Sequence, residues 1–539
     1  MATAGRSGLG SADGISVATD RDSAHRPRGD RRVGAFLVAA MLVAYLASAG
    51  GSLATSDAVV TYDVTRQMVE HRSIALSADL VGNEAYRGPD GQYYSPFGIF
   101  QALWNIPFYV AGRAAYALLP ARGMSLEMVT KAAVALGNAC TAALAVWLVW
   151  WIAASAASTA RGALAAALTA GFATSLWPYS KFGFNVPLSA LLIAAIAWYS
   201  IEGARTGRAT TTALAGIMCG LALLTRHEFG LAALPSILLL AWYGRRALGK
   251  TLGWWALGVA PGAGVWALYN LARYGSPIET GYFKDQTLGM GGSLIDGLWG
   301  QIASPGASVF VYSPVMLMAP VAVWLIRKRE PQLAWLVGGT ALLFTIFYSQ
   351  LESWAGGRSY GPRYLVPFMP LLCVPLAVWM SHCRRSVRVA GFVVALLSCV
   401  VQVPGVLVDF SKVRVNFARD MNVTYETHLH QWSTSPLALN IRASVDAVPR
   451  VVRQMIGAEP RPPVTGDPGR QARDFSQQFA FSLDFWWVYL FYLGVFPAWV
   501  SVIVGVTLGM TACWLLGAAW SRAHWLDHHV ASGVGAVAD

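Results

Sequence analysis

Long apolar runs separated by short polar turns dominate the chain. Each run has roughly the ~20 residues that a helix needs to cross the hydrocarbon core of a bilayer. The runs lie at residues 33–53, 126–153, 160–178, 186–203, 210–225, 229–243, 251–272, 305–326, 333–350, 363–381, 388–408 and 485–519. The pattern predicts an all-α polytopic membrane protein with about twelve transmembrane helices.

One apolar segment does not fit this count. Residues 97–118, "FGIFQALWNIPFYVAGRAAYAL", contain Asn105, Pro107 and Arg113. If they crossed the membrane, every later basic loop would lie on the opposite side from the basic N-terminal tail, against the positive-inside rule. Broken backbone at membrane depth is tolerated only where it packs on protein or lines a wet cavity. We therefore predict a re-entrant or interfacial segment; the alternative is that it spans and another long run bends back.

Composition supports the membrane interpretation. The 539 residues are 55% hydrophobic and 13% charged, which excludes an ordinary soluble multidomain protein. The net charge of +12 comes from arginines in short loops between apolar runs, where they set membrane orientation, so we expect no nucleic-acid partner. All six cysteines lie in apolar runs or at the end of one, without a CxxC motif, which indicates neither a disulfide framework nor a thiolate metal site.

The same patterns divide the chain into four parts. Residues 1–32 are predicted to be a disordered cytoplasmic tail, and 33–408 the membrane module. Residues 409–484 are predicted to form an extracytoplasmic segment that contains a linker, "EPRPPVTGDPGRQARD", and 485–539 the final transmembrane helix with a cytoplasmic tail. Arginine outnumbers lysine 34 to 6, as is typical of GC-rich bacterial genomes, so the expected compartment is the bacterial cytoplasmic membrane.

Candidate chemistry gathers in the first outer loop. In "TSDAVVTYDVTRQMVEHRSIAL", residues 55–76, apolar side chains recur every four positions, which predicts an amphipathic helix along the membrane surface. Asp57 lies at its start and Asp63 six residues later. Either Ser56 or Asp57 caps this helix, or Asp57 carries chemistry; the two roles are compatible.

Six motifs in order along the chain then point to a family. They are "DGQYYSPFG" (90–98), "WPYSKFGFNVPL" (177–188), "LLTRHEFGLAALP" (223–235), "YNLARYGSPIETGY" (269–282), "VYSPVMLMAP" (311–320) and "WAGGRSYGPRYLVPFMPLL" (354–372). Together with the acidic residue after the first span, they resemble the GT-C superfamily of membrane glycosyltransferases, in the group related to protein mannosyltransferases, lipid A aminoarabinose transferases and rhizobial lipopolysaccharide transferases. The resemblance covers most of residues 33–408 and implies a GT-C type bundle. From residue 409 onward no family is recognised.

The resemblance implies an activity. Such enzymes move a sugar from a polyprenyl phosphate to a hydroxyl acceptor outside the cytoplasmic membrane, usually with inversion. The chemistry needs a carboxylate to take the hydroxyl proton, and Asp57 or Asp63 is the candidate; family members often show an acidic pair here, so one or both could act. It also needs cations for the departing phosphate. The candidates for the phosphate are Arg358, Arg363, Arg226, His227 and Lys181, and those for lining the substrate are Glu228, Tyr93, Tyr94, Tyr312 and Tyr360.

Several of these residues also have purely structural interpretations. Arg226, His227 and Glu228 could form a local charge cluster, and Arg363 could anchor a helix end at the headgroups. Interfacial aromatic belts would explain the tyrosines.

No cofactor is indicated by the sequence. His428 and His430 lack a third ligand at metal-binding spacing, so no metal site is predicted there, although some superfamily members use a divalent metal. The DxD pattern at residues 20–22 lies in the predicted tail and is discounted.

A transporter or flippase of lipid-linked sugars is the alternative class. Such proteins usually carry ionisable groups deep in their helices, and the central stretches of the runs from 229 to 381 have none. The partners that the resemblance implies are a polyprenyl-phosphate-linked sugar, an envelope glycan, lipid or protein acceptor, and membrane lipids.

Overall fold

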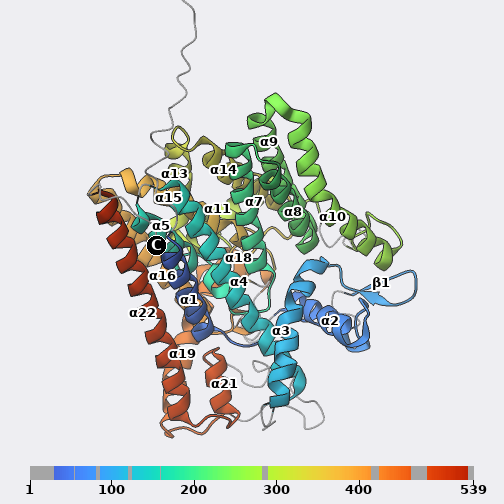
Figure 1. The fold of residues 1–539 in the computed structure, drawn as a ribbon. Helices are drawn as coiled ribbons and strands as arrows, with labels where there is room; N and C mark the ends of the chain where they lie inside the picture. Colours follow the sequence, from blue (N-terminus) through green and yellow to red (C-terminus); the bar gives the residue numbers. More distant parts are fainter. Residues whose placement is uncertain are drawn as a thin grey trace, which may run out of the picture.

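The protein is described here by a computed structural model that covers residues 30–53, 55–80, 85–118, 124–157, 159–281, 289–357, 359–413, 424–462 and 482–531. Within these ranges nearly every element is a helix (Figure 1). The one sheet among them is a short hairpin in which β1 (Tyr86–Arg87) pairs antiparallel with β2 (Tyr93–Tyr94). The predicted tail and linker lie almost entirely outside the described residues.

Six described helices are long and apolar enough to cross a membrane, which confirms a polytopic membrane fold. They are α1 (Arg31–Ser48), α4 (Leu126–Ala156), α7 (Val186–Thr206), α14 (Pro331–Ser349), α16 (Arg385–Leu407) and α22 (Ala498–Ala531). Three shorter apolar helical segments accompany them: α8 (Ala209–Thr225), η5 with α13 (Pro314–Ile326) and η6 with α15 (Val366–His382). The number of twelve crossings stays a prediction.

The remaining elements are shorter or less apolar. They are η2 (Ala78–Leu80), α5 (Ala160–Phe172), α6 (Leu176–Tyr179), η3 (His227–Ala232), α9 (Ala233–Tyr243), η4 (Arg245–Ala247), α10 (Leu248–Tyr274), α11 (Leu294–Ala303), α12 (Val309–Tyr312), α18 (Tyr425–His430), η7 (Trp432–Thr434), α19 (Pro436–Met455) and α21 (Trp486–Tyr492). The apolar run at 485–519 is therefore not one continuous helix. The chain turns at Gly494, where φ is +74°, so the span is α22 alone.

Helices α2 (Ser56–His71) and α3 (Ile99–Leu118) lie toward the lower right end of the bundle in Figure 1. We call this the α2 end. The cap of α2 differs from the prediction, because neither Ser56 nor Asp57 supplies it. Thr55 is the N-cap, and its hydroxyl oxygen accepts a hydrogen bond from the backbone N–H of Ala58 at 3.3 Å. Asp57 is thereby left free of the capping role.

Helix α3 corresponds to the segment that did not fit the count of spans. It begins beside the last turn of α8, where Gly98 lies so close to the carbonyl of Leu224 that no side chain would fit. It then runs antiparallel to the first half of α4, and the Trp104 indole donates to the Thr141 hydroxyl at 2.9 Å. It is not among the candidate spans. The re-entrant or interfacial placement of this segment stays a prediction.

Glycines bring α8 and α10 into backbone contact. Gly258 of α10 lies against the carbonyl of Ala213, and Gly216 of α8 lies against the carbonyl of Trp255. A Cβ atom at either position would collide with backbone, which cannot move aside as a flexible side chain can. Small residues at such contacts are the usual means by which membrane helices approach closely.

Adding a methyl group at this contact is expected to destabilise the protein. Gly258→Ala forces the two helices apart and should cost about 1–3 kcal/mol. Gly264→Ala is the matched control in the same helix, because no atom lies within 4 Å of its added Cβ. It should be neutral or stabilising by up to ~1 kcal/mol through helix propensity. Thermal unfolding of the purified variants in detergent measures both, and equal shifts would contradict the backbone contact.

Candidate active site

The first turn of α2 brings Asp57 to a guanidinium from far along the chain. The Arg363 side chain forms an ion pair with the Asp57 carboxylate across a sequence separation of 306 residues. The Arg363 side chain is only 15% exposed and the Asp57 side chain only 17%. Two residues that the sequence singled out for different roles are therefore in direct contact.

The loop that carries Arg363 depends on three glycines. Gly356, Gly357 and Gly361 have φ values of +76°, +75° and +75°, a left-handed conformation that other residues adopt only with strain. The resulting coil folds back on itself, and Arg363 Nη1 donates to the carbonyl of Gly356 at 3.4 Å. The glycines therefore shape the loop instead of leaving it flexible. Arg358, from the same loop, lies outside the described residues.

The Arg363 guanidinium keeps one donor available. Its Nε–H is buried and has no hydrogen-bond partner among the residues that the structure describes. The plane of the group lies over the Phe184 ring, with Cζ 4.1 Å from the ring centre. A buried donor without a partner is costly, so its presence beside an ion pair suits an anionic oxygen as a ligand.

Arg226 forms a second charged cluster next to this loop. It follows α8 and pairs with Glu228 of η3 at 2.5 Å. Its guanidinium carbon lies 5.3 Å from the centre of the Tyr364 ring, and that ring stacks on Tyr348 at 4.6 Å. The Tyr348 hydroxyl in turn donates to Glu228 at 3.4 Å. Because Tyr364 follows Arg363 in the chain, the two arginine sites are joined through aromatic rings.

His227 is neutral and joins the Trp266 indole to the carbonyl of Pro96 by hydrogen bonds. Its Nδ1 accepts from the Trp266 indole at 2.7 Å, so the proton is carried by Nε2, which donates to the carbonyl of Pro96 at 3.1 Å. Burial, and then the positive charge of Arg273, lowers the pKa of His227 to about 4. This residue in the α8–α9 connection thus supplies no positive charge near neutral pH.

Arg273 was not identified from the sequence. It is fully buried at the end of α10, and its guanidinium donates to the carbonyls of Ser95 and Phe97. These contacts hold the chain on both sides of Pro96, where it enters α3. The sequence feature that could have identified Arg273 is a cation in the last turn of an apolar run, followed by a glycine. In the structure this glycine, Gly275, is left-handed with φ of +74°.

A cavity of about 1000 Å³ opens beside this cluster, between η3 and the ends of α10 and α14. Its polar lining includes Glu228 and Glu279, and its aromatic lining includes Trp266 and Phe347. The volume matches that of ligand pockets in general. Glu228 is therefore placed both beside a cation and on the wall of a cavity.

Asp63 is placed apart from the Asp57 pair. It is 2% exposed, and its carboxylate pairs with Arg66 at 2.6 Å. The same carboxylate accepts from the backbone N–H of Ser77 at 2.8 Å and from its hydroxyl at 3.0 Å. These contacts close the turn after α2, so Asp63 has a structural task in this arrangement.

Lys181 is also engaged elsewhere. Its ammonium forms a 2.9 Å ion pair with Asp484, both side chains having no exposure, and also donates to the carbonyl of Val406. The Tyr489 hydroxyl donates to Asp484 at 2.7 Å. Asp484 was missed because it follows the predicted linker, where no motif was recognised. The pair ties the segment before α21 to the membrane module.

The predicted lining tyrosines lie in two places. Tyr312 and Tyr360 are fully buried in the core, with ring centres 4.9 Å apart in an edge-to-face arrangement. Tyr93 and Tyr94 form β2 of the hairpin, and the Tyr94 hydroxyl donates to Asp90 at 2.6 Å.

Neither the histidine pair nor any other group forms a metal cluster among the described residues. His428 is buried and hydrogen-bonds through Nδ1 to the carbonyl of Thr434. No set of three or more metal-ligating side chains occurs in the part of the chain that was searched.

Removing one member of the buried ion pair is expected to destabilise the protein strongly. Lys181→Met leaves the Asp484 charge buried and unpaired, at a cost of about 3–5 kcal/mol. Adding Asp484→Asn removes that charge, so the double variant should recover much of the loss. Arg453→Met breaks the exposed pair with Glu459 and serves as the control, costing ~1 kcal/mol or less. Unfolding midpoints in detergent give the comparison, and strictly additive losses would contradict the pairing.

Comparisons with known proteins give one family match over part of the chain and several similar solved structures. Residues 115–266 match the family model described as dolichyl-phosphate-mannose-protein mannosyltransferase. Among curated proteins no match was found. Similar solved structures include ArnT from Cupriavidus metallidurans bound to undecaprenyl phosphate, with 14% identity, 93% of this chain and 77% of that chain covered, and a TM-score of 0.47.

Two further solved structures are similar to this chain. The apo state of the same ArnT has 14% identity, covers 90% of this chain and 77% of that one, and has a TM-score of 0.45. Arabinosyltransferase EmbB from Mycobacterium smegmatis has 13% identity, 93% and 42% coverage, and a TM-score of 0.43. Over residues 115–266, which run from the end of α3 into α10, the chain thus carries the sequence pattern of the mannosyltransferase family, and the resemblance inferred from its motifs is confirmed there.

Proposed function

We propose that this protein is an inverting glycosyltransferase that moves a sugar from a polyprenyl-phosphate donor to a hydroxyl group of an envelope glycan, lipid or protein. The observation that carries the proposal is the contact between Asp57 and Arg363, a carboxylate and a guanidinium at the α2 end of a membrane bundle. The family model that matches residues 115–266 is named for a polyprenol-phosphate sugar donor, which supports the donor class.

In the proposed reaction Asp57 is the general base. The acceptor oxygen attacks the anomeric carbon, the bond from that carbon to the phosphate oxygen breaks, and the Asp57 carboxylate takes the hydroxyl proton. Positioned acid–base groups of this kind contribute about 10²-fold to 10⁴-fold in rate. Since Thr55 caps α2, the Asp57 carboxylate is not occupied by the helix N-terminus.

Arg363 is the proposed partner of the leaving phosphate. Its buried Nε–H is available to a phosphate oxygen, and its remaining donors could turn from Asp57 to the phosphate as negative charge grows there. A partly dry site strengthens this stabilisation relative to bulk water. Arg226, whose guanidinium lies against the Tyr364 ring next to Arg363, is a further candidate cation, and Arg358 remains a candidate outside the described residues.

The acceptor is proposed to reach Asp57 from the side of the cavity beside Glu228. Carboxylates and aromatic faces are suited to holding sugar hydroxyls and rings, and Glu228, Glu279 and Trp266 line that cavity. The basic loops lie at the opposite end of the bundle, and loops rich in arginine and lysine stay on the cytoplasmic side. We therefore expect the α2 end to face outward from a bacterial cytoplasmic membrane.

Replacing Asp57 tests the base. Asp57→Asn should lower kcat by about 10²-fold to 10⁴-fold while leaving the donor Kd nearly unchanged, since asparagine keeps the shape but cannot take the proton. The assay follows release of polyprenyl phosphate from a polyprenyl-phosphate sugar by purified protein in vesicles with envelope extract as acceptor. Glu426→Gln, at an exposed acid of α18, is the control. Normal turnover in Asp57→Asn would refute the assignment, and absence of release by the parent protein would favour a transporter or flippase.

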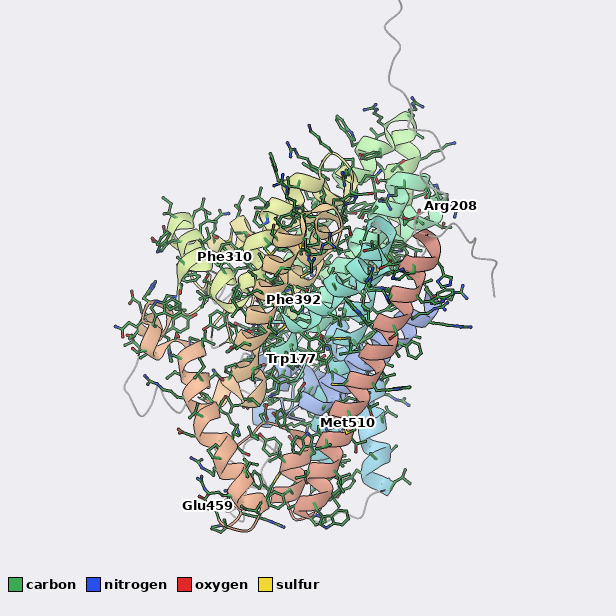
Figure 2. The ribbon with its side chains drawn as sticks, turned by 90° about the vertical axis from the view of Figure 1, so that its left-hand side faces the viewer. Trp177, Arg208, Phe310, Phe392, Glu459 and Met510 are labelled. Atoms are coloured by element: carbon green, nitrogen blue, oxygen red, sulfur yellow. The ribbon has the colours of Figure 1, made fainter. Side chains whose placement is uncertain are left out.

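Replacing Arg363 tests the phosphate contact. Arg363→Ala should weaken donor binding and turnover by about tenfold to a hundredfold, the loss typical of a charged hydrogen bond. Arg363→Lys should recover only part, because an ammonium lacks the bidentate fork. Arg208→Ala, at the opposite end of the molecule in Figure 2, should have no effect. Full activity of Arg363→Ala would place the phosphate elsewhere.

A further inference from the structure

Helix α19 lies where two membrane-spanning helices end. Its buried residues Leu439 and Ala443 cluster with Val408, directly after α16. Near its other end, Val451 clusters with Met128 in the first turn of α4. Figure 2 shows Glu459, just beyond α19, at the opposite end of the molecule from Arg208. The helix therefore runs from the end of α16 to the start of α4 at the α2 end.

The side chains of α19 divide into three faces at 100° per residue. The first face packs on the protein and consists of the buried residues Leu439, Ala443, Ala447 and Val451.

The second face is apolar but exposed. It consists of Ile441, Val445, Val448 and Val452, which recur at spacings of four, three and four and are 44%, 66%, 39% and 52% exposed. We call these four residues the apolar stripe. A row of branched aliphatic side chains at helical spacing is not the scatter of single apolar residues that any protein surface shows.

The third face is charged. It carries Arg442, Asp446 and Arg453, all exposed, and Arg450 borders it. Three arginines against one aspartate give this face a positive balance. Around the helix, one face thus contacts the protein, the next exposes apolar side chains, and the third exposes charged side chains.

A bilayer interface is the environment that supplies all three at once. The neighbouring helix α16 supports this placement, because it exposes Phe392, Leu396 and Val400 as a helix facing lipid does. Because α16 and α19 pack against each other, the apolar stripe belongs to a helix that adjoins this lipid-facing one. Arginine side chains beside such a stripe can extend to the phosphates of the headgroups.

We propose that α19 is an interfacial membrane helix whose apolar stripe lies in the bilayer beside the ends of α16 and α4, with its charged face at the headgroups. The helix would then fix the segment from residue 424 to 462 to the membrane surface. This role is independent of the glycosyl transfer proposed above. It concerns a part of the chain in which no family was recognised.

Photocrosslinking of the full-length protein in vesicles of phosphatidylethanolamine and phosphatidylglycerol tests this placement. Val448→benzoylphenylalanine puts the probe on the apolar stripe, and Arg453→benzoylphenylalanine puts it on the charged face one turn away. Leu396→benzoylphenylalanine on α16 is the positive control for lipid contact. Mass spectrometry of the protein then measures covalent lipid adducts, which require an acyl C–H bond within reach of the probe.

The expected result is a lipid adduct at positions 396 and 448, with about tenfold less at 453, because only the stripe reaches the acyl region. A crosslinked dimer at 448 would assign the stripe to a second copy instead. An adduct at 396 with none at 448 would show that lipid does not cover the stripe. Either outcome overturns the proposal.

Discussion

The ion pair between Asp57 and Arg363 is the interaction on which the α2 end depends. Both side chains are mostly buried, so each charge loses much of its hydration and is compensated by the other. The pair therefore requires α2 and the loop after α14 to meet accurately. Left-handed glycines shape that loop, and Arg273 holds the chain around Pro96 by its carbonyls, so the surrounding structure is organised to keep two distant segments together.

Three buried cations in this region are stabilised in different ways. Arg363 pairs with a carboxylate and keeps one donor without a partner among the described residues, whereas Lys181 pairs with Asp484 in a site without exposure. Arg273 relies on backbone carbonyls and on the Tyr269 ring, 3.8 Å from its guanidinium carbon. A cation committed to neutral carbonyls or to a buried carboxylate is a structural tie. One that retains a donor is equipped to receive a ligand.

The sequence predicted the features that depend on length and order. Apolar runs of spanning length indicated the membrane fold, and the stretch at 55–76 and the motif at 354–372 drew attention to the two segments that meet at the α2 end. The ion-pair partner of Lys181 was not predictable, because the sequence around a lysine at the end of an apolar run is the same whether the lysine binds a phosphate or Asp484. The neutral state of His227 depends on Trp266, a contact that no local pattern reveals. The cap at Thr55 lay one residue outside the prediction, within the usual uncertainty of helix ends.

The buried pair of Lys181 and Asp484 has a consequence for biogenesis. During synthesis the lysine enters the membrane long before the ribosome has made its partner, since Asp484 directly precedes α21. Until then the Lys181 ammonium has no carboxylate partner at the end of the incomplete bundle, and it stays hydrated or bound to the insertion machinery. A chain stopped short of Asp484 leaves that charge without its carboxylate partner. The C-terminal part thus supplies a late-arriving counter-ion to the first half of the chain as well as an additional span.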